Sequence, residues 1–232
     1  MNGISNQIQT ELFLLQDEAY KAFNKKLVPT VAEDTMIGIR TPVLRKFAKT
    51  LFKTRPDDAE LFMHILPHRY FEENNLHAFL IECIQDIDQA AAETERFLPF
   101  IDNWETCDLF SPPVFKKSPD RIYRHILTWL QSPHCYTVRY GIGLLLSNYL
   151  DEEFKREMLD LVADIISGEY YVNMMIAWYF STALVKQYAA AIPYIETKRL
   201  RPFTHNKAIQ KAVESTRISP EIKAYLKTLK IR

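Results

Sequence analysis

The chain has 232 residues, with 29 basic and 29 acidic side chains and a formal net charge of zero at pH 7. This length fits one domain with a large core, and the ordinary hydrophobic (47%) and charged (25%) fractions exclude global disorder. Only five glycines occur, which argues against a glycine-rich nucleotide-binding fold. The balanced charge argues against a strongly basic nucleic-acid binder when the chain is taken as a whole.

No signal peptide or membrane span is expected from the sequence. The N-terminal residues are polar every few positions and lack a basic region followed by an apolar run. No stretch of about 18 apolar residues occurs anywhere in the chain. The three cysteines, Cys83, Cys107 and Cys135, form no CxxC pair, so we expect reduced thiols in a cytoplasmic protein.

Apolar residues recur at helical spacing from the N-terminus onward. Ile8, Leu12 and Leu15 begin the first stripe, and further stripes follow in segments 43–52, 76–84, 122–129, 158–166 and 208–213. The pattern predicts an all-α fold of about eleven to thirteen helices, each of roughly 9 to 18 residues. The longest helix-like apolar segment runs from Tyr170 to Val185.

Proline marks where several of these helices are expected to begin. The predicted starts are at Thr41-Pro42, Arg55-Pro56, Ser118-Pro119, Ser132-Pro133 and Ser219-Pro220. Gly168 is placed to end a helix. Because no Gly- or Ser-rich linker interrupts the series, we expect one domain over residues 1–232. Many similar short helices favour an α-solenoid, with an irregular helical globule as the alternative.

The zero net charge hides an uneven distribution. Residues 197–232 contain ten basic and two acidic side chains, a net charge of +8, so residues 1–196 carry −8. A basic cluster of this kind attracts phosphates in a salt-dependent way. A solvated helical face is the other interpretation of the same charge run.

Motifs for nucleotides and metals are missing. The sequence contains no GxGxxG, GxxxxGK, GxSxG or HExxH pattern. His64 and His68 are four residues apart, but Pro67 lies between them and no third ligand is near. We therefore expect neither a metal nor a cofactor.

Trp104 and Asp108 are the residues whose spacing suggests chemistry. They are four apart and share one face if the segment is helical. A carboxylate beside a large aromatic ring is suited to stabilise a developing cation or to activate water. A core tryptophan with an aspartate that caps the next turn is the other interpretation. Trp178 lies in another apolar helix, where a lone tryptophan is usually part of the core. Arg139 interrupts an otherwise apolar helix and is either a snorkelling edge residue or a functional cation that faces a groove.

Five segments together resemble the AlkD-like DNA alkylation repair proteins: residues 37–46 (IGIRTPVLRK), 103–108 (NWETCD), 138–139 (VR), 176–178 (IAW) and 203–211 (FTHNKAIQK). They follow the family's order and span nearly the whole chain. The resemblance implies a right-handed superhelix of stacked antiparallel HEAT-like helix pairs with a concave groove for DNA. It also implies a monomeric DNA glycosylase that excises positively charged alkylated purines from duplex DNA.

The resemblance assigns roles to individual residues. Asp108 matches the catalytic aspartate, and Trp104 matches a tryptophan that lines the deoxyribose of the lesion. Arg139 matches a groove arginine that contacts the DNA backbone, and Trp178 matches a second aromatic wall. We also expect DNA contacts from four basic residues of the C-terminal segment: Lys198, Arg199, Lys207 and Lys211.

The N-terminal stretch departs from the resemblance. Residues 13–29 look unlike the N-terminal helices that clamp DNA in the characterised glycosylases and more like a divergent subgroup. The alternative function is therefore a catalytically weak or inactive HEAT-like scaffold that binds nucleic acid or a protein partner.

Overall fold

The structure, a computed structural model, describes residues 2–231. Within this range there are fifteen α-helices and two short 3-10 helices, and no strand. The all-α prediction is confirmed. None of these helices is both long and apolar enough to cross a membrane. Backbone contacts divide the chain into two compact units, one ending at Ser118 and one beginning at Pro119; the expectation of one domain over residues 1–232 stays a prediction.

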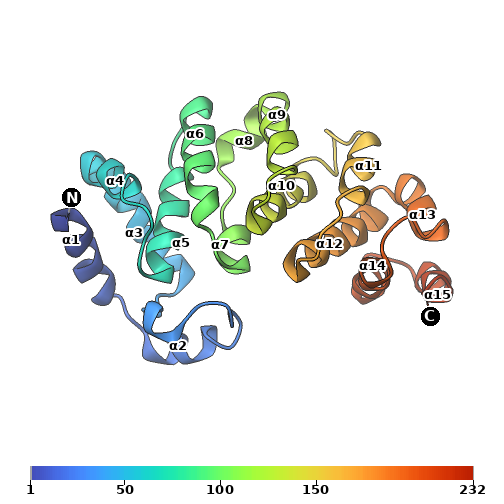
Figure 1. The fold of residues 1–232 in the computed structure, drawn as a ribbon, viewed down its shortest axis with the longest axis horizontal. Coiled ribbons are helices and arrows are strands. Elements are labelled where there is room, and N and C mark those ends of the chain that lie inside the picture. Colours follow the sequence, from blue (N-terminus) through green and yellow to red (C-terminus); the bar gives the residue numbers. More distant parts are fainter. Residues whose placement is uncertain (1, 232) are drawn as a thin grey trace. The chain divides into compact units, whose positions relative to one another are not determined.

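Unit 1 is built around one central helix (Figure 1). Its elements are α1 (Asn2–Phe13), α2 (Glu18–Asn24), η1 (Glu33–Thr35), α3 (Thr41–Thr54), α4 (Pro56–Met63), α5 (Phe71–Ile81), α6 (Ile87–Phe97), η2 (Leu98–Phe100), α7 (Trp104–Leu109) and α8 (Pro113–Lys117). Helix α5 packs against α3, α4, α6 and α7, and all eleven of its residues are buried. Because α7 packs on α5, the core of unit 1 sets where α7 lies.

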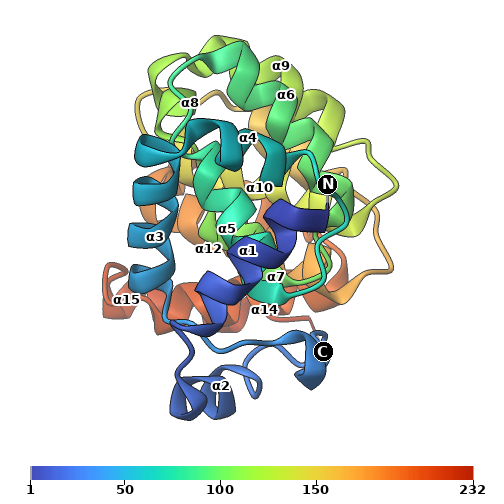
Figure 2. The same cartoon turned by 90° about the vertical axis from the view of Figure 1, so that its left-hand side faces the viewer.

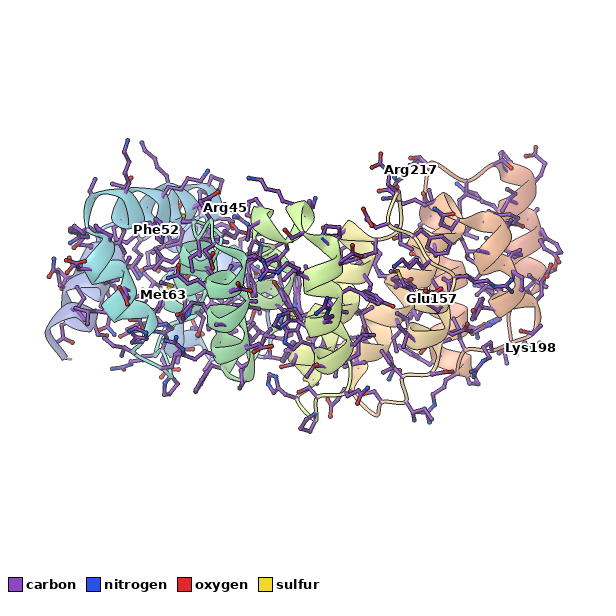
Figure 3. The ribbon with its side chains drawn as sticks, turned by 90° about the horizontal axis from the view of Figure 1, so that it is seen from above. Arg45, Phe52, Met63, Glu157, Lys198 and Arg217 are labelled. Carbon is purple, nitrogen blue, oxygen red and sulfur yellow. The ribbon has the colours of Figure 1, made fainter. Side chains whose placement is uncertain are left out.

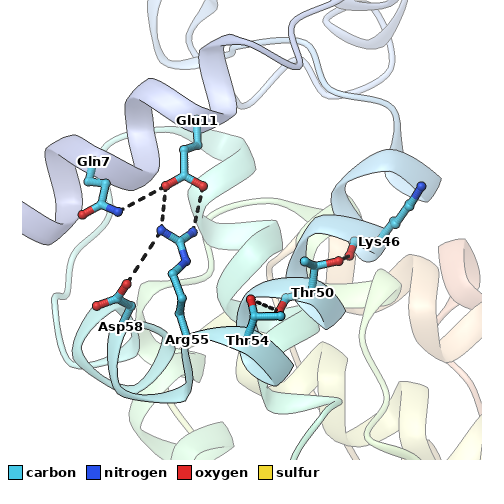
Figure 4. A network of polar contacts seen from close by, with 7 residues as sticks. All are labelled: Gln7, Glu11, Lys46, Thr50, Thr54, Arg55 and Asp58. Carbon is cyan, nitrogen blue, oxygen red and sulfur yellow. Dashed lines mark hydrogen bonds and ion pairs between the residues drawn. The ribbon is translucent and has the colours of Figure 1, made fainter.

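Helix α1 is held to α4 by an ion pair (Figure 4). The Arg55 guanidinium donates to both carboxylate oxygens of Glu11, at 2.8 and 2.7 Å. Asp58 lies 3.7 Å from the same guanidinium. Helix α2 and the turns that follow it lie at one end of the unit 1 helices in both ribbon views (Figures 1 and 2). These turns, residues 25–40, are called the arm below.

Unit 2 contains two rows of helices that pack against each other. Its elements are α9 (Pro119–Trp129), α10 (Cys135–Asn148), α11 (Glu157–Ala163), α12 (Tyr170–Lys186), α13 (Tyr188–Glu196), α14 (Pro202–Glu214) and α15 (Pro220–Thr228). Helices α10, α12 and α14 pack side by side, and α9, α11, α13 and α15 pack against them. This alternation is consistent with an α-solenoid, and the right-handed superhelix stays a prediction.

The first turns of α10, α12 and α14 are in contact. The rings of Tyr136 and Tyr171 are 6.0 Å apart, and those of Tyr170 and Phe203 are 5.9 Å apart. Tyr136, Tyr170 and Phe203 each lie within the first two residues of their helices, so α10, α12 and α14 run in the same direction. Residues at equal depth along these helices are therefore neighbours.

Proline predicted four of the five helix starts correctly. Helices begin at Thr41, Pro56, Pro119 and Pro220, but the fifth begins at Cys135 because His134 takes the capping position. Gly168 ends no helix, since α11 stops at Ala163 and Gly168 lies in the loop before α12. The structure also has more and shorter helices than expected, down to the five residues of α8.

Candidate functional site

Helix α7 carries both Trp104 and Asp108. Asn103 caps its N-terminus, with its side-chain oxygen accepting from the Thr106 backbone N–H at 2.8 Å. A capping side chain satisfies a backbone donor that would otherwise lack a partner, which explains why so short a segment is helical. Trp104 and Asp108 are four apart within this helix and both are half-buried. The expected placement on one helical face is confirmed.

Buried hydrogen bonds fix α7 on α5. The Thr106 hydroxyl donates to the Asn75 side-chain oxygen at 2.7 Å, and the Asn103 amide donates to the same hydroxyl at 3.0 Å. Thr106 and Asn103 are fully buried, and Asn75 is nearly so. Since buried polar groups are costly to leave unpaired, this network holds α7 in one orientation.

Trp104 is held by the arm. Its indole N–H donates to the Leu27 carbonyl at 3.1 Å, and its ring packs against a cluster of Val28, Met36 and Phe71. The sequence did not indicate this contact, because the two partners are 77 positions apart. The arm therefore positions the residue that the family resemblance places at the lesion.

The arm is in turn fastened by Glu72. Its carboxylate accepts from the backbone N–H groups of Ile37, Gly38 and Ile39, at 2.8, 2.7 and 3.3 Å. Burial raises the pKa of Glu72, although the same N–H bonds act in the opposite direction. Gly38 has φ +96°, and a Cβ there would lie 2.5 Å from the Lys21 Cβ. This position therefore requires glycine.

Arg45 and Glu82 clasp the backbone that follows Asp108. Arg45, on α3 (Figure 3), pairs with Glu82 and donates to the Leu109 carbonyl. Glu82 also accepts from the Ser111 backbone N–H at 3.0 Å. The guanidinium lies 4.0 Å from the centroid of the Phe79 ring. The sequence did not indicate this pair. Arg45 belongs to the 37–46 motif, but nothing in that motif indicates that Glu82 is its partner.

Unit 2 brings two predicted site residues together. Trp178 on α12 keeps 42% of its surface exposed, and the Lys211 ammonium on α14 lies 5.9 Å from the centroid of its ring. Such a cation–π contact contributes about 0.5–1 kcal/mol at an exposed site. The expected aromatic wall and one expected DNA-binding lysine are therefore in contact, with the tryptophan exposed and the lysine half-buried.

Arg139 occupies a different environment. It is 6% exposed, and its Nη1 donates to the Tyr171 carbonyl at 2.6 Å. Its guanidinium carbon lies 6.0 Å from the centroid of the Tyr171 ring. The residue thus ties α10 to the first turn of α12, and contact between Arg139 and DNA stays a prediction.

The other expected DNA-binding residues are spread over unit 2. Arg199 forms an ion pair with Asp164. Lys198 follows α13 with φ 55° and is exposed (Figure 3). Lys207 on α14 donates to the Gln210 side chain at 3.1 Å. The +8 segment is therefore partly neutralised by the acidic body, while Lys207 and Lys211 stay on the accessible side of α14.

No site for a metal was found among residues 2–231, because no three His, Cys, Asp or Glu side chains gather there. His68 instead lies 2.9 Å from His77, from Nε2 to Nδ1. Phe62 stacks on His68 and Phe97 stacks on His77. This histidine pair is part of the unit 1 core.

A match to one known protein family covers most of the chain. No curated protein matches the chain. The family model described as "DNA alkylation repair enzyme" matches residues 8–212, which includes α7, α12 and almost all of α14. That range covers most of both units. The chain therefore belongs to the DNA alkylation repair enzyme family.

Proposed function

We propose that the chain is a monofunctional DNA glycosylase that excises positively charged alkylated purines from duplex DNA. Membership of the family supports a role in the repair of alkylated DNA. The observation that supports glycosylase activity in particular is the geometry of α7. Buried hydrogen bonds and the arm hold this helix in place, with Trp104 and Asp108 on one face of it. The proposed chemistry needs no metal or cofactor.

The chemistry follows from the charge of the substrate. An alkylated purine already carries a positive charge, so it leaves with the electron pair of the glycosidic bond and becomes neutral without an acid. The sugar becomes an oxocarbenium-like cation, which the Asp108 carboxylate stabilises. Asp108 then takes a proton from the water that attacks C1′. The face of Trp104, on the same helix, adds cation–π attraction worth about 0.5–2 kcal/mol, so Asp108 carries the larger part.

The decisive experiment measures release of alkylpurine from methylated duplex DNA. The wild-type protein is expected to release it well above the spontaneous rate, and Asp108→Asn is expected to reduce release to that rate. Asp57→Asn is the matched control, because Asp57 is an exposed carboxylate of α4 in the same unit. Release at the spontaneous rate by the wild type would refute the proposal.

A second candidate function is nucleic-acid binding without catalysis. Trp104 already donates its ring N–H to Leu27, and Arg139 is buried against Tyr171. These contacts give Trp104 and Arg139 a structural role that does not require catalysis. Exposed Trp178 and half-buried Lys211 then remain as the pair suited to nucleic acid.

The salt dependence of binding tests the second function. Lys207→Ala and Lys211→Ala are each expected to reduce the slope of log affinity against log salt by about 0.9, the contribution of one phosphate contact. Lys227→Ala on α15 is the control, as it removes an exposed lysine from another helix. Salt-independent binding, or identical slopes for all three variants, would remove the nucleic-acid version of this function.

A further inference from the structure

Two exposed aromatic rings lie at the starts of α12 and α14, away from Trp178. Tyr170 is 56% exposed and Phe203 is 44% exposed. Their centroids are 5.9 Å apart with an interplanar angle of 53°. Tyr170 also meets the Tyr171 ring edge-on, with the centroids 5.3 Å apart. A single exposed aromatic residue is ordinary on a protein surface, but two exposed rings in contact on adjoining helices form an apolar patch.

The two rings line a pocket of about 440 Å³. Its other lining residues are polar or small: Ser167, Gly168, Asn173, Arg201, Pro202 and Thr204. Asn173 donates to the carbonyls of Ser167 and Glu169, both at 3.0 Å, which holds the loop before α12 in place. The pocket is therefore lined by a fixed polar loop and by two exposed aromatic residues.

Arg201 gives the pocket a cation. The residue is exposed, and its Nη1 donates to the Ser167 carbonyl at 3.1 Å. A guanidinium has five N–H donors in a planar fork, so this one bond orients the group and leaves donor capacity for a phosphate.

The pocket and the Trp178–Lys211 pair are separated by the same number of residues on α12 and on α14. Trp178 is eight residues after Tyr170, and Lys211 is eight residues after Phe203. Because α12 and α14 run in the same direction, the two aromatic features lie about 12 Å apart along the helices. Lys207 lies one turn beyond Phe203, between them. Aromatic rings with cations beside them are the combination that proteins use to bind single-stranded nucleic acid, because the rings stack on bases and the cations contact phosphates.

We propose that Tyr170 and Phe203 form a stacking site for one unpaired nucleobase of DNA, with Arg201 holding the adjacent phosphate. The inference rests on the proposed function only in that DNA is the ligand. The rings supply stacking, which tolerates any base, and the guanidinium supplies the charged contact. Unpaired bases are thereby preferred over paired ones, because a base inside a duplex offers no free face.

The test compares two duplexes of the same sequence, one with a single unpaired 2-aminopurine bulge and one fully paired. Wild-type protein is expected to bind the bulged duplex about tenfold more tightly and to change the 2-aminopurine fluorescence on binding. Tyr170→Leu and Phe203→Leu, which keep apolar volume without a ring, are expected to abolish the preference. Tyr225→Leu is the matched control, since Tyr225 is an exposed aromatic residue of α15.

Arg201→Gln separates the phosphate contact from stacking. This variant is expected to keep the preference for the bulge while the slope of log affinity against log salt falls by about 0.7–0.9. Equal wild-type affinity for the two duplexes, no binding to either, or a preference that survives both leucine substitutions would overturn the inference. A bulge preference without alkylpurine release would retain it while the proposed glycosylase activity fails.

Discussion

Removal of the Arg45 guanidinium is the perturbation that we expect to affect the α7 region most. In Arg45→Met, the aliphatic stem beside Phe79 is kept, but Glu82 loses its ion pair and the Leu109 carbonyl loses its donor. Removing one partner of a fully buried ion pair costs about 3–5 kcal/mol. The Arg45 and Glu82 side chains keep 33% and 16% exposure, so solvent screening reduces this part to about 1–2 kcal/mol.

The lost bond to the Leu109 carbonyl adds about 1.5 kcal/mol, because its donor is charged. The free energy of unfolding is therefore expected to fall by about 3 kcal/mol in total. Urea unfolding measures this as a lower midpoint with an unchanged slope. Arg96→Met is the control, because it breaks an i,i+3 pair with Glu93 on α6 and is expected to cost less than about 1 kcal/mol.

A second readout connects the clasp to function. Leu109 directly follows Asp108, so a loosened backbone there is expected to lower the rate of alkylpurine release more than the affinity for DNA. A double-mutant cycle with Glu82→Gln is expected to give a coupling energy of about 1–2 kcal/mol. An Arg45→Met protein whose stability matches that of the Arg96→Met control would refute the reasoning.

Three further outcomes are expected. Burial lowers the pKa of His68 from the ordinary histidine value of 6.5 to about 4, so as the pH falls the unfolded chain takes up a proton at this residue before the folded chain does. The free energy of unfolding should thus fall by up to about 3 kcal/mol between pH 6.5 and pH 4, as chemical denaturation can measure, and His68→Phe should flatten this fall. Gly38→Ala is expected to cost at least about 1–2 kcal/mol, since alanine disfavours φ +96° and its Cβ meets Lys21. Limited proteolysis should then cut the arm faster, and unchanged resistance would contradict this account. Arg55→Ala should lower the unfolding free energy by about 1 kcal/mol at low salt and by less at 1 M salt, because its pair with Glu11 is half-exposed; a salt-independent loss would point to packing instead.

Helix class and most helix starts could be read from the sequence because their causes are local. Pro56 and Pro220 begin helices as expected, since proline fixes its own φ and lacks the N–H that a first turn leaves unpaired. The start at Cys135 was missed because two capping signals, at Ser132 and His134, compete within three residues. Family motifs were recognisable for the same reason, as each is a short run of neighbouring residues.

Long-range partners could not be predicted in this way. Trp104 donates to Leu27, Arg45 pairs with Glu82, and Glu72 binds the arm through backbone N–H groups that any residue except proline would supply. Their spacing follows no helical or strand period. Only folding brings such partners within hydrogen-bond distance.

The charge distribution shows most clearly the difference between what the sequence indicates and what folding adds. The sequence alone shows that the zero net charge is a −8 body joined to a +8 C-terminal segment. The packing of the helices is what pairs Arg199 with Asp164 and sets Lys211 over the exposed Trp178 ring. Charge adds up along a chain, but whether a cation meets a carboxylate or an accessible ring depends on which helices pack together.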